Sequence, residues 1–115
     1  MRIRMHPGFR DELAALGRSD RREANAIGHA LHVLSEQGGR LGYPWTSAVR
    51  GKRGSGLREL RPRAGRSAHR VLYRVAPNRV DALALAPEAG NDQRGFAHAV
   101  EHARARAHAI DQETT

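Results

Sequence analysis

The sequence contains no cysteine, which excludes disulfide bridges, thiolate metal sites and a cysteine nucleophile. It also lacks a long apolar run, and its first residues, MRIRMHPGF, carry two arginines in place of a hydrophobic segment. We therefore expect no membrane span and no secretory signal, and we predict a soluble cytoplasmic protein. With 115 residues the chain has room for one domain, which buries about two-thirds of the surface of its unfolded form.

Acidic residues are scarce, because the chain has 12 Asp and Glu against 20 Lys and Arg, a formal net charge of +8. Lysine is almost absent, since every basic residue except Lys52 is an arginine. This balance predicts a polyanionic partner such as RNA, DNA, the ribosome or an acidic protein, and planar guanidinium groups suit phosphate contacts. A G+C-rich genome would produce the same preference for arginine, so the net charge carries more weight than the arginine count.

Hydrophobic periodicity predicts one α+β domain at residues 1–110, followed by a frayed tail at 111–115. A helical hairpin would pack on a small antiparallel sheet, with a C-terminal helix and one sheet face left open for function. The expected elements, in chain order, are a strand at 1–6, helices at 7–17 and 20–38, an exposed and mobile loop at 37–56, strands at 57–61, 68–76 and 79–86, and a helix at 92–110.

Arginines gather on two of the predicted strands, in the segment LRELRPRAGRSAHRVLYR. Alternation along the first of these strands sets Glu59 and Arg61 on the face opposite Arg58. Because one carboxylate cannot neutralise the whole group, the segment predicts an anion site. For Glu59 itself, the alternative is a plain ion pair with Arg61 or Arg70 across the sheet. The arginines of the predicted site are Arg58, Arg61, Arg70 and Arg74.

Three short motifs follow the predicted helical hairpin in order: LGYP at residues 41–44, LRELR at 57–61 and HRVLYRV at 69–75. This ordered set resembles the HigB-like branch of the RelE/ParE toxin superfamily, over roughly residues 5–110. The resemblance implies the toxin of a type II toxin–antitoxin system, with a small sheet packed on a helical hairpin. It further implies an endoribonuclease that cleaves mRNA in the ribosomal decoding site and so inhibits translation, without a metal or another cofactor.

Metal-independent RNA cleavage uses the 2′-OH beside the scissile phosphate as the nucleophile, so the protein must stabilise the charge that develops on the phosphorane. The resemblance implies arginines for this task and Tyr73 as a proton donor or base-stacking platform. Glu59 is a candidate general base, with the ion-pair role as its alternative. The predicted catalytic residues are Arg58, Glu59, Arg61, Arg70 and Tyr73.

The Gly-rich loop carries side chains suited to holding RNA. Tyr43 and Trp45 can stack on bases, and the alternative for Trp45 is to anchor the loop in the core. The basic residues nearby have no acidic neighbours and can contact phosphates. The predicted RNA-binding residues are Arg50, Lys52, Arg53, Arg74 and Arg94.

The segment after the last predicted strand, APEAGNDQRGF, departs from the pattern of the relatives, which commonly carry a lysine there. Glu88 falls near that position, and Phe96 is the aromatic residue of the final helix. Catalysis would then rely on Arg94 or on a histidine, or the protein would bind RNA and cleave it poorly.

Two of the seven histidines, His98 and His102, lie one helical turn apart with Glu101 between them. This spacing occurs in zinc sites, but no third ligand is evident, and a solvated helix face is the favoured interpretation. His69 neighbours Arg70 in the chain, although it would point to the opposite face of the strand. We therefore predict no metal site.

Two other functions fit the same residues. A ParE-like toxin would bind DNA gyrase without nuclease chemistry, and a diverged relative would be a non-catalytic RNA-binding module. For the ribonuclease interpretation, the expected partners are a cognate antitoxin protein with acidic patches, the ribosome and mRNA, with no membrane partner.

Overall fold

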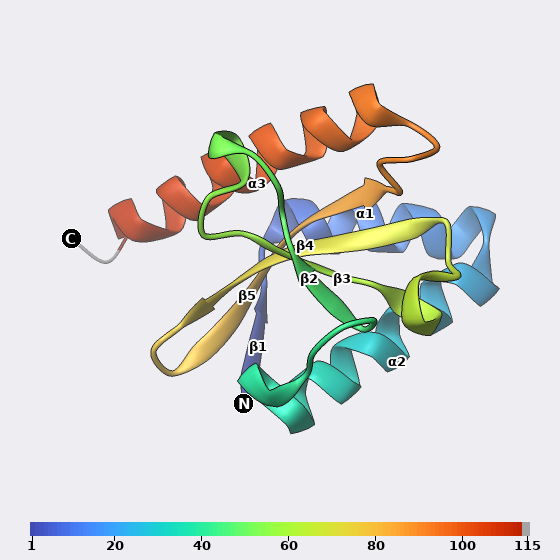
Figure 1. Cartoon of the computed structure of the whole chain (residues 1–115), viewed down its shortest axis with the longest axis horizontal. Coiled ribbons are helices and arrows are strands. Elements are labelled where there is room, and N and C mark those ends of the chain that lie inside the picture. The colour runs from blue at the N-terminus through green and yellow to red at the C-terminus, as the bar shows by residue number, and fades with distance from the viewer. Residues whose placement is uncertain (114–115) are drawn as a thin grey trace.

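The computed structural model describes residues 1–113, which form a five-stranded sheet and three α-helices within that range (Figure 1). The strand order is β1-β5-β4-β3-β2, with β1 parallel to β5 and the other neighbours antiparallel. None of the described helices is long and apolar enough to cross a membrane. The elements are β1 (Arg2–Met5), α1 (Pro7–Ser19), α2 (Arg21–Gln37), the 3-10 turn η1 (Gly38–Arg40), β2 (Thr46–Ala48), η2 (Lys52–Gly54), β3 (Arg58–Leu60), η3 (Pro62–Gly65), β4 (His69–Ala76), β5 (Arg79–Pro87) and α3 (Gln93–Glu113).

The predicted helical hairpin is confirmed, and its ends follow from local capping. Pro7 occupies the first turn of α1, where a missing N–H costs nothing, and His6 Nδ1 accepts a hydrogen bond from the Gly8 N–H at 2.9 Å. Asp20 alone separates the two helices, and its carboxylate accepts from the Glu23 N–H at 3.1 Å. This short connection folds α1 and α2 back against each other.

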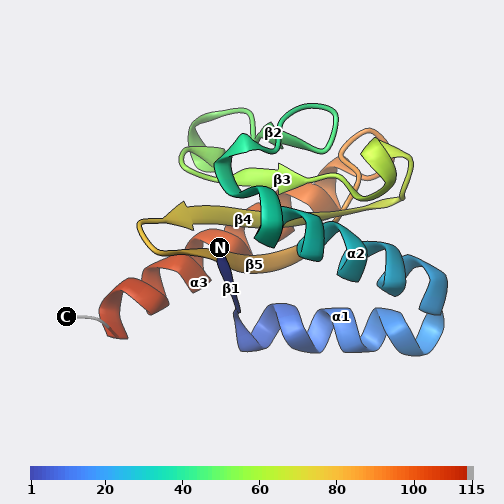
Figure 2. The ribbon, with the colours of Figure 1, turned by 90° about the horizontal axis from the view of Figure 1, so that it is seen from below.

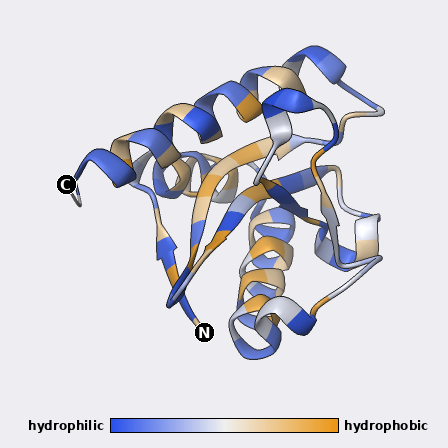
Figure 3. Ribbon diagram, turned by 60° about the vertical axis from the view of Figure 1, so that its left-hand side comes forward, coloured by the Kyte–Doolittle hydropathy of each residue, from blue (hydrophilic) through white to orange (hydrophobic). Residues whose placement is uncertain are grey.

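Helices cover both faces of the sheet, so the expectation of one open face is wrong. Phe9 of α1 and Ile27 of α2 pack with Tyr73 against one face. On the other face, Val100 and Ile110 of α3 belong to a second apolar cluster with strand residues. In Figure 2 the sheet runs between α2, in front, and α3, behind, and in Figure 3 the hydrophobic colour concentrates in the central strands between them. A functional site must therefore lie at an edge of this sandwich.

The segment at 37–56, expected to be an exposed mobile loop, instead contributes an edge strand. β2 pairs antiparallel with β3, and buried Thr46 donates its hydroxyl proton to the Leu41 carbonyl at 3.0 Å. Val49 is buried in the α3 cluster. Only three residues long and surrounded by glycines, β2 gives no detectable alternation in the sequence.

The final helix also extends further than expected. Its N-terminus is capped as predicted, since Asp92 accepts a hydrogen bond from the Gly95 N–H at 2.8 Å. The helix continues through residues 111–113, which the sequence placed in a frayed tail, and ion pairs hold this last turn: Arg74 with Asp111 and Arg4 with Glu113, each at 2.8 Å. The remaining two residues of the expected tail, 114 and 115, lie outside the described residues.

Candidate functional site

A cavity of about 390 Å³ opens beside β2 and β3, where the segment after β5 leads into α3. We call it the β2–β3 cleft. Ser47 lies opposite Glu59 in the strand register, and alternation along the chain brings Arg61 to the same side. The cleft is lined by Tyr43, Ser47, Ala48, Arg50, Glu59, Arg61, Ala89 and Phe96. It thus unites three predicted site residues, Arg50, Glu59 and Arg61, with the predicted stacking residue Tyr43.

Arg61 is fixed in the cleft by two acceptors and an aromatic ring. Its Nε donates to the Pro44 carbonyl oxygen at 3.0 Å, and its Nη1 donates to Glu59 Oε1 at 3.2 Å. Its guanidinium carbon lies 5.5 Å from the centre of the Tyr43 ring, a cation–π distance. Tyr43 is 78% exposed, so its ring remains available to a ligand.

Gly65 leaves room for the Arg61 side chain. A Cβ atom at this position would lie 2.6 Å from Arg61 Nη2, and the backbone φ of +93° disfavours any side chain. The turn η3 therefore packs against Arg61 Nη2, while Pro44 and Glu59 accept hydrogen bonds from its Nε and Nη1.

Arg70 contacts Glu59 from beneath the cleft, because its Nε lies 3.5 Å from Glu59 Oε1. The residue is only 2% exposed, and its other nitrogens donate to the carbonyl oxygens of Ser67, His69 and Gly65 at 2.8–3.3 Å. Burial lowers the pKa of Arg70, as does the charge of Arg61, whereas Glu59 opposes both effects. Arg70 thus presents almost no surface to the cleft, unlike what its predicted catalytic role requires, and its contacts suit a residue that positions Glu59 and η3.

Two further predicted catalytic residues, Arg58 and Tyr73, lie on the opposite side of the sheet from the cleft. Tyr73 is 1% exposed within the core beneath α1 and α2, where it can neither stack on a base nor reach a reacting group. Arg58 donates from Nε to the Tyr73 hydroxyl oxygen at 3.3 Å and from Nη2 to Thr46 Oγ1 at 3.0 Å. Strand alternation sends both side chains toward α1 and α2, so neither of them lines the cleft.

The predicted RNA-binding arginines differ in how they are engaged. Arg74 is bound by buried Asp81 and by Asp111, and the Asp111 hydrogen bond raises the pKa of Arg74. Arg53 donates to both carboxylate oxygens of Glu101 at 2.7 and 2.8 Å. Both arginines thus pair with acidic side chains of α3, and Arg74 in addition with Asp81 of β5.

Arg50, Lys52 and Arg94 are, among the described residues, the members of the predicted RNA-binding set that are both exposed and unengaged. Within residues 1–113, no hydrogen bond or ion pair occupies their side chains. Arg50 lines the cleft itself, whereas Lys52 lies on η2 and Arg94 on the first turn of α3.

Glu23 forms a buried anchor between α2 and the start of β4. Its carboxylate accepts from the Ser67 hydroxyl and the Ala68 N–H, and it lies 2.9 Å from His69 Nδ1. Burial on its own would raise the pKa of Glu23, but hydrogen bonds from His69 and Ser67 hold it below its ordinary value. His69 thus points away from Arg70, as predicted.

The α3 histidines do not converge with other ligands. His98 and His102 are exposed, and Glu101 is engaged by Arg53. In the described part of the chain, no three His, Asp or Glu side chains come close enough to hold a metal ion.

The sequence alone did not place Ser47, Ala89 and Phe96 in the site. Ser47 was hidden because β2 was not recognised, and the register of that strand is what brings it opposite Glu59. Ala89 follows Glu88, so the segment after β5 reaches the cleft without contributing a cation.

Comparisons with known proteins agree with this architecture. The profile of the family described as Phage derived protein Gp49-like (DUF891) matches residues 11–87. The protein HigB2 of Mycobacterium tuberculosis (strain ATCC 25618 / H37Rv), which carries the name of a toxin, is 42% identical over 73 residues. That stretch covers 63% of this chain and 35% of HigB2, so the chain spans about a third of this relative.

Solved structures share the fold at low sequence identity. The YoeB/ParE toxin from Agrobacterium tumefaciens gives a TM-score of 0.56 at 18% identity, covering 72% of this chain and 93% of that one. The heterotetrameric YoeB-YefM toxin-antitoxin complex from Staphylococcus aureus gives 0.54 at 17% identity, covering 71% and 90%. These findings confirm the resemblance that the three motifs indicated. The chain belongs to the Gp49-like family, and it shares its α+β fold with the YoeB/ParE toxin structure.

Proposed function

We propose that the chain is the toxin of a type II toxin–antitoxin system and acts as a ribosome-dependent mRNA endoribonuclease, with the β2–β3 cleft as its active site. The observation that carries the proposal is Arg61, held rigidly by Pro44, Glu59 and the Tyr43 ring at the wall of a cavity large enough for a nucleotide. The name of the HigB2 relative and the fold shared with YoeB toxins support it.

The chemistry follows from what a fixed guanidinium does to a phosphate. The 2′-OH of the mRNA attacks the adjacent phosphorus in line, and the 5′-oxygen of the next nucleotide leaves. Arg61 stabilises the phosphorane charge at little reorganisation cost because its acceptors already hold it in place. Arg50 supplies the second cation that the segment around Ala89 lacks.

Substrate positioning would come from the aromatic groups of the cleft. Tyr43 is exposed beside Arg61, and Phe96 also lines the cavity. A base can therefore stack on an aromatic ring while its phosphate contacts the Arg61 guanidinium. Glu59 is the candidate base for the 2′-OH proton. It pairs with both Arg61 and Arg70, and its main contribution is to hold Arg61.

An acidic antitoxin protein is the proposed partner that restrains this activity. The net charge of +8 and the exposed cations at the cleft suit a carboxylate-rich segment that covers Arg50 and Arg61. The fold relative YoeB was crystallised with YefM, its antitoxin.

The test is a translation extract programmed with a defined mRNA, with and without ribosomes. We expect the wild type to cut the mRNA only on ribosomes. Arg61→Ala should cut about 10²–10³-fold more slowly, the loss typical of removing one charge-stabilising donor. Arg18→Ala, a change at an exposed position on α1, is the matched control and should cut at the wild-type rate. An inactive wild type would refute the proposal, and intact mRNA with DNA-damage signalling in expressing cells would indicate gyrase instead.

A further inference from the structure

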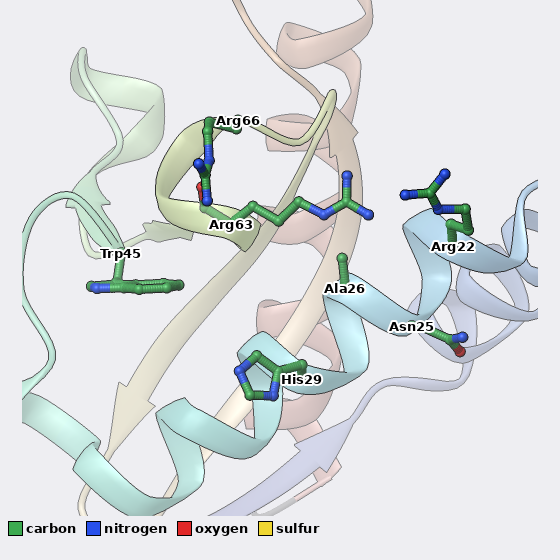
Figure 4. A pocket seen from close by; sticks show the side chains of 7 residues that line it. All are labelled: Arg22, Asn25, Ala26, His29, Trp45, Arg63 and Arg66. Atoms are coloured by element: carbon green, nitrogen blue, oxygen red, sulfur yellow. The ribbon is translucent and has the colours of Figure 1, made fainter.

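A second hollow, of about 490 Å³, lies between α2 and η3, outside the β2–β3 cleft. We call it the α2–η3 groove. In Figure 4 the Trp45 ring is seen edge-on below Arg66, while Arg63 reaches from η3 toward α2, where Arg22 and His29 lie. The groove thus combines one flat aromatic ring with three guanidinium groups from two separate elements.

The positive charge of the groove is poorly compensated. Within residues 1–113, Arg22 makes no side-chain hydrogen bond or ion pair, and Arg66 uses only its Nε, which donates to the Arg63 carbonyl at 3.1 Å. The nearest carboxylate, Glu23, lies 3.5 Å from Arg63 Nη1 and already accepts hydrogen bonds from the start of β4. An anionic ligand would therefore find unoccupied donors here.

The turn that presents Arg63 is held in an unusual backbone conformation. Arg63 and Ala64 both have a φ of +56°, a region that side chains rarely adopt. Buried Arg70 holds the end of this turn through the Gly65 carbonyl and the following segment through Ser67. The groove and the cleft are thus built on the same support.

One short chain segment connects the groove with the cleft. Tyr43 lines the cleft, Trp45 lines the groove, and the Pro44 carbonyl between them accepts from Arg61. Only Pro44 separates the two aromatic residues, so a strand stacked on Tyr43 would find Trp45 as a neighbouring ring for a second base.

We propose that the α2–η3 groove binds a nucleotide of the same single-stranded RNA, with its base on Trp45 and its phosphate on Arg22, Arg63 and Arg66. The inference rests on the proposed function, because it takes RNA as the ligand of the cleft. A nucleotide uses both features of the groove, the flat ring and the guanidinium groups, whereas the carboxylates of an acidic peptide use only the second.

Trp45 is the chain's single tryptophan, so intrinsic tryptophan fluorescence comes from a residue of the groove. The probe is a short 2′-O-methyl oligoadenylate, which lacks the nucleophile and cannot be cleaved. We expect it to quench Trp45 and to bind at least about tenfold more weakly to the Arg22→Ala/Arg66→Ala variant. The slope of the logarithm of the binding constant against the logarithm of salt concentration should also become shallower in that variant, by the amount expected for the loss of about two phosphate contacts. Arg21→Ala, an exposed neighbour on α2 outside the groove, should bind like the wild type.

Absence of quenching would overturn the inference, as would equal quenching by polyglutamate, which would assign the groove to an acidic protein. The cleavage assay separates this outcome from the proposed function. Quenching without any mRNA cleavage would refute the nuclease and leave the groove standing, and cleavage without quenching would refute the groove alone. Arg61→Ala should lose cleavage yet still show quenching at saturating oligonucleotide.

Discussion

Arg61 and Arg70 contact the same carboxylate, that of Glu59, yet their surroundings give them different tasks. Arg61 lines an open cavity beside an exposed aromatic ring, whereas Arg70 is sealed beneath it and donates to three main-chain carbonyls. Both belong to motifs that the sequence marked as functional. The difference in burial leaves Arg61 accessible to a phosphate and confines Arg70 to contacts within the protein.

Replacing Arg70 should cost more stability than replacing any exposed arginine. Arg70→Met would leave three carbonyl groups and one side of Glu59 unpaired in a buried region, so we expect a loss of about 3–5 kcal/mol in the free energy of unfolding. Urea denaturation measures this loss. Arg10→Met, at an exposed position on α1, should change stability by less than about 0.5 kcal/mol. Equal stability of the two variants would contradict the support role of Arg70.

Among the elements, those with a long periodic pattern were predictable and the short ones were not. The caps at Asp20 and Asp92 and the apolar spacing on the helices predicted the hairpin and the start of α3. β2 was missed because three residues among glycines show no period. Alternation correctly set Glu59 and Arg61 on the face opposite Arg58, but the sequence could not show that helices cover both faces of the sheet. The burial of Arg70 was equally hidden, since arginine is rarely buried.

The role of the turn η3 in positioning Arg61 can be tested by comparing two glycines that share a backbone conformation. Gly65 and Gly51 have φ values of +93° and +88°, so replacing either by alanine should cost about 1 kcal/mol or more. Only at Gly65 would the new Cβ meet the Arg61 guanidinium. We therefore expect Gly65→Ala to slow mRNA cleavage far more than Gly51→Ala, measured at equal folded fraction. Equal rates would show that η3 does not set the position of Arg61.

The link between α2 and β4 should weaken in acid through Glu23. In the folded chain the pKa of Glu23 lies below its ordinary value of 4.5. The Glu23 carboxylate therefore contributes its full stabilisation at pH values above 4.5, and this contribution is lost as the pH falls through the pKa of the folded state. His69 and Arg63 are the charged or titratable groups that face it. At neutral pH the wild type should have a larger free energy of unfolding than Glu23→Gln in urea denaturation, and the difference between the two should shrink on acidification. A difference that does not change with pH would contradict this role.

For the whole molecule, the arginines behind the net charge of +8 differ in what they contact, and several, such as Arg10 and Arg18 on α1, lie exposed away from both hollows. Some arginines form ion pairs within the fold, such as Arg74 with Asp81 and Arg106 with Glu12. Others remain at the β2–β3 cleft and the α2–η3 groove, the two hollows on either side of the Tyr43–Trp45 segment. Part of the charge that the composition assigned to a general polyanion partner therefore lies at the two hollows that the proposed RNA strand would contact.

The most direct test of this account is the chemical nature of the ends on mRNA cut by the wild-type protein on ribosomes. Attack by the 2′-OH, with the phosphorane stabilised by Arg61, leaves a 5′-hydroxyl on the downstream fragment and a 2′,3′-cyclic phosphate on the upstream one. We predict these ends, and a substrate with a single 2′-deoxy substitution at the cleavage position should remain intact. Fragments with 5′-phosphate ends, or cleavage of the 2′-deoxy substrate, would contradict the central claim.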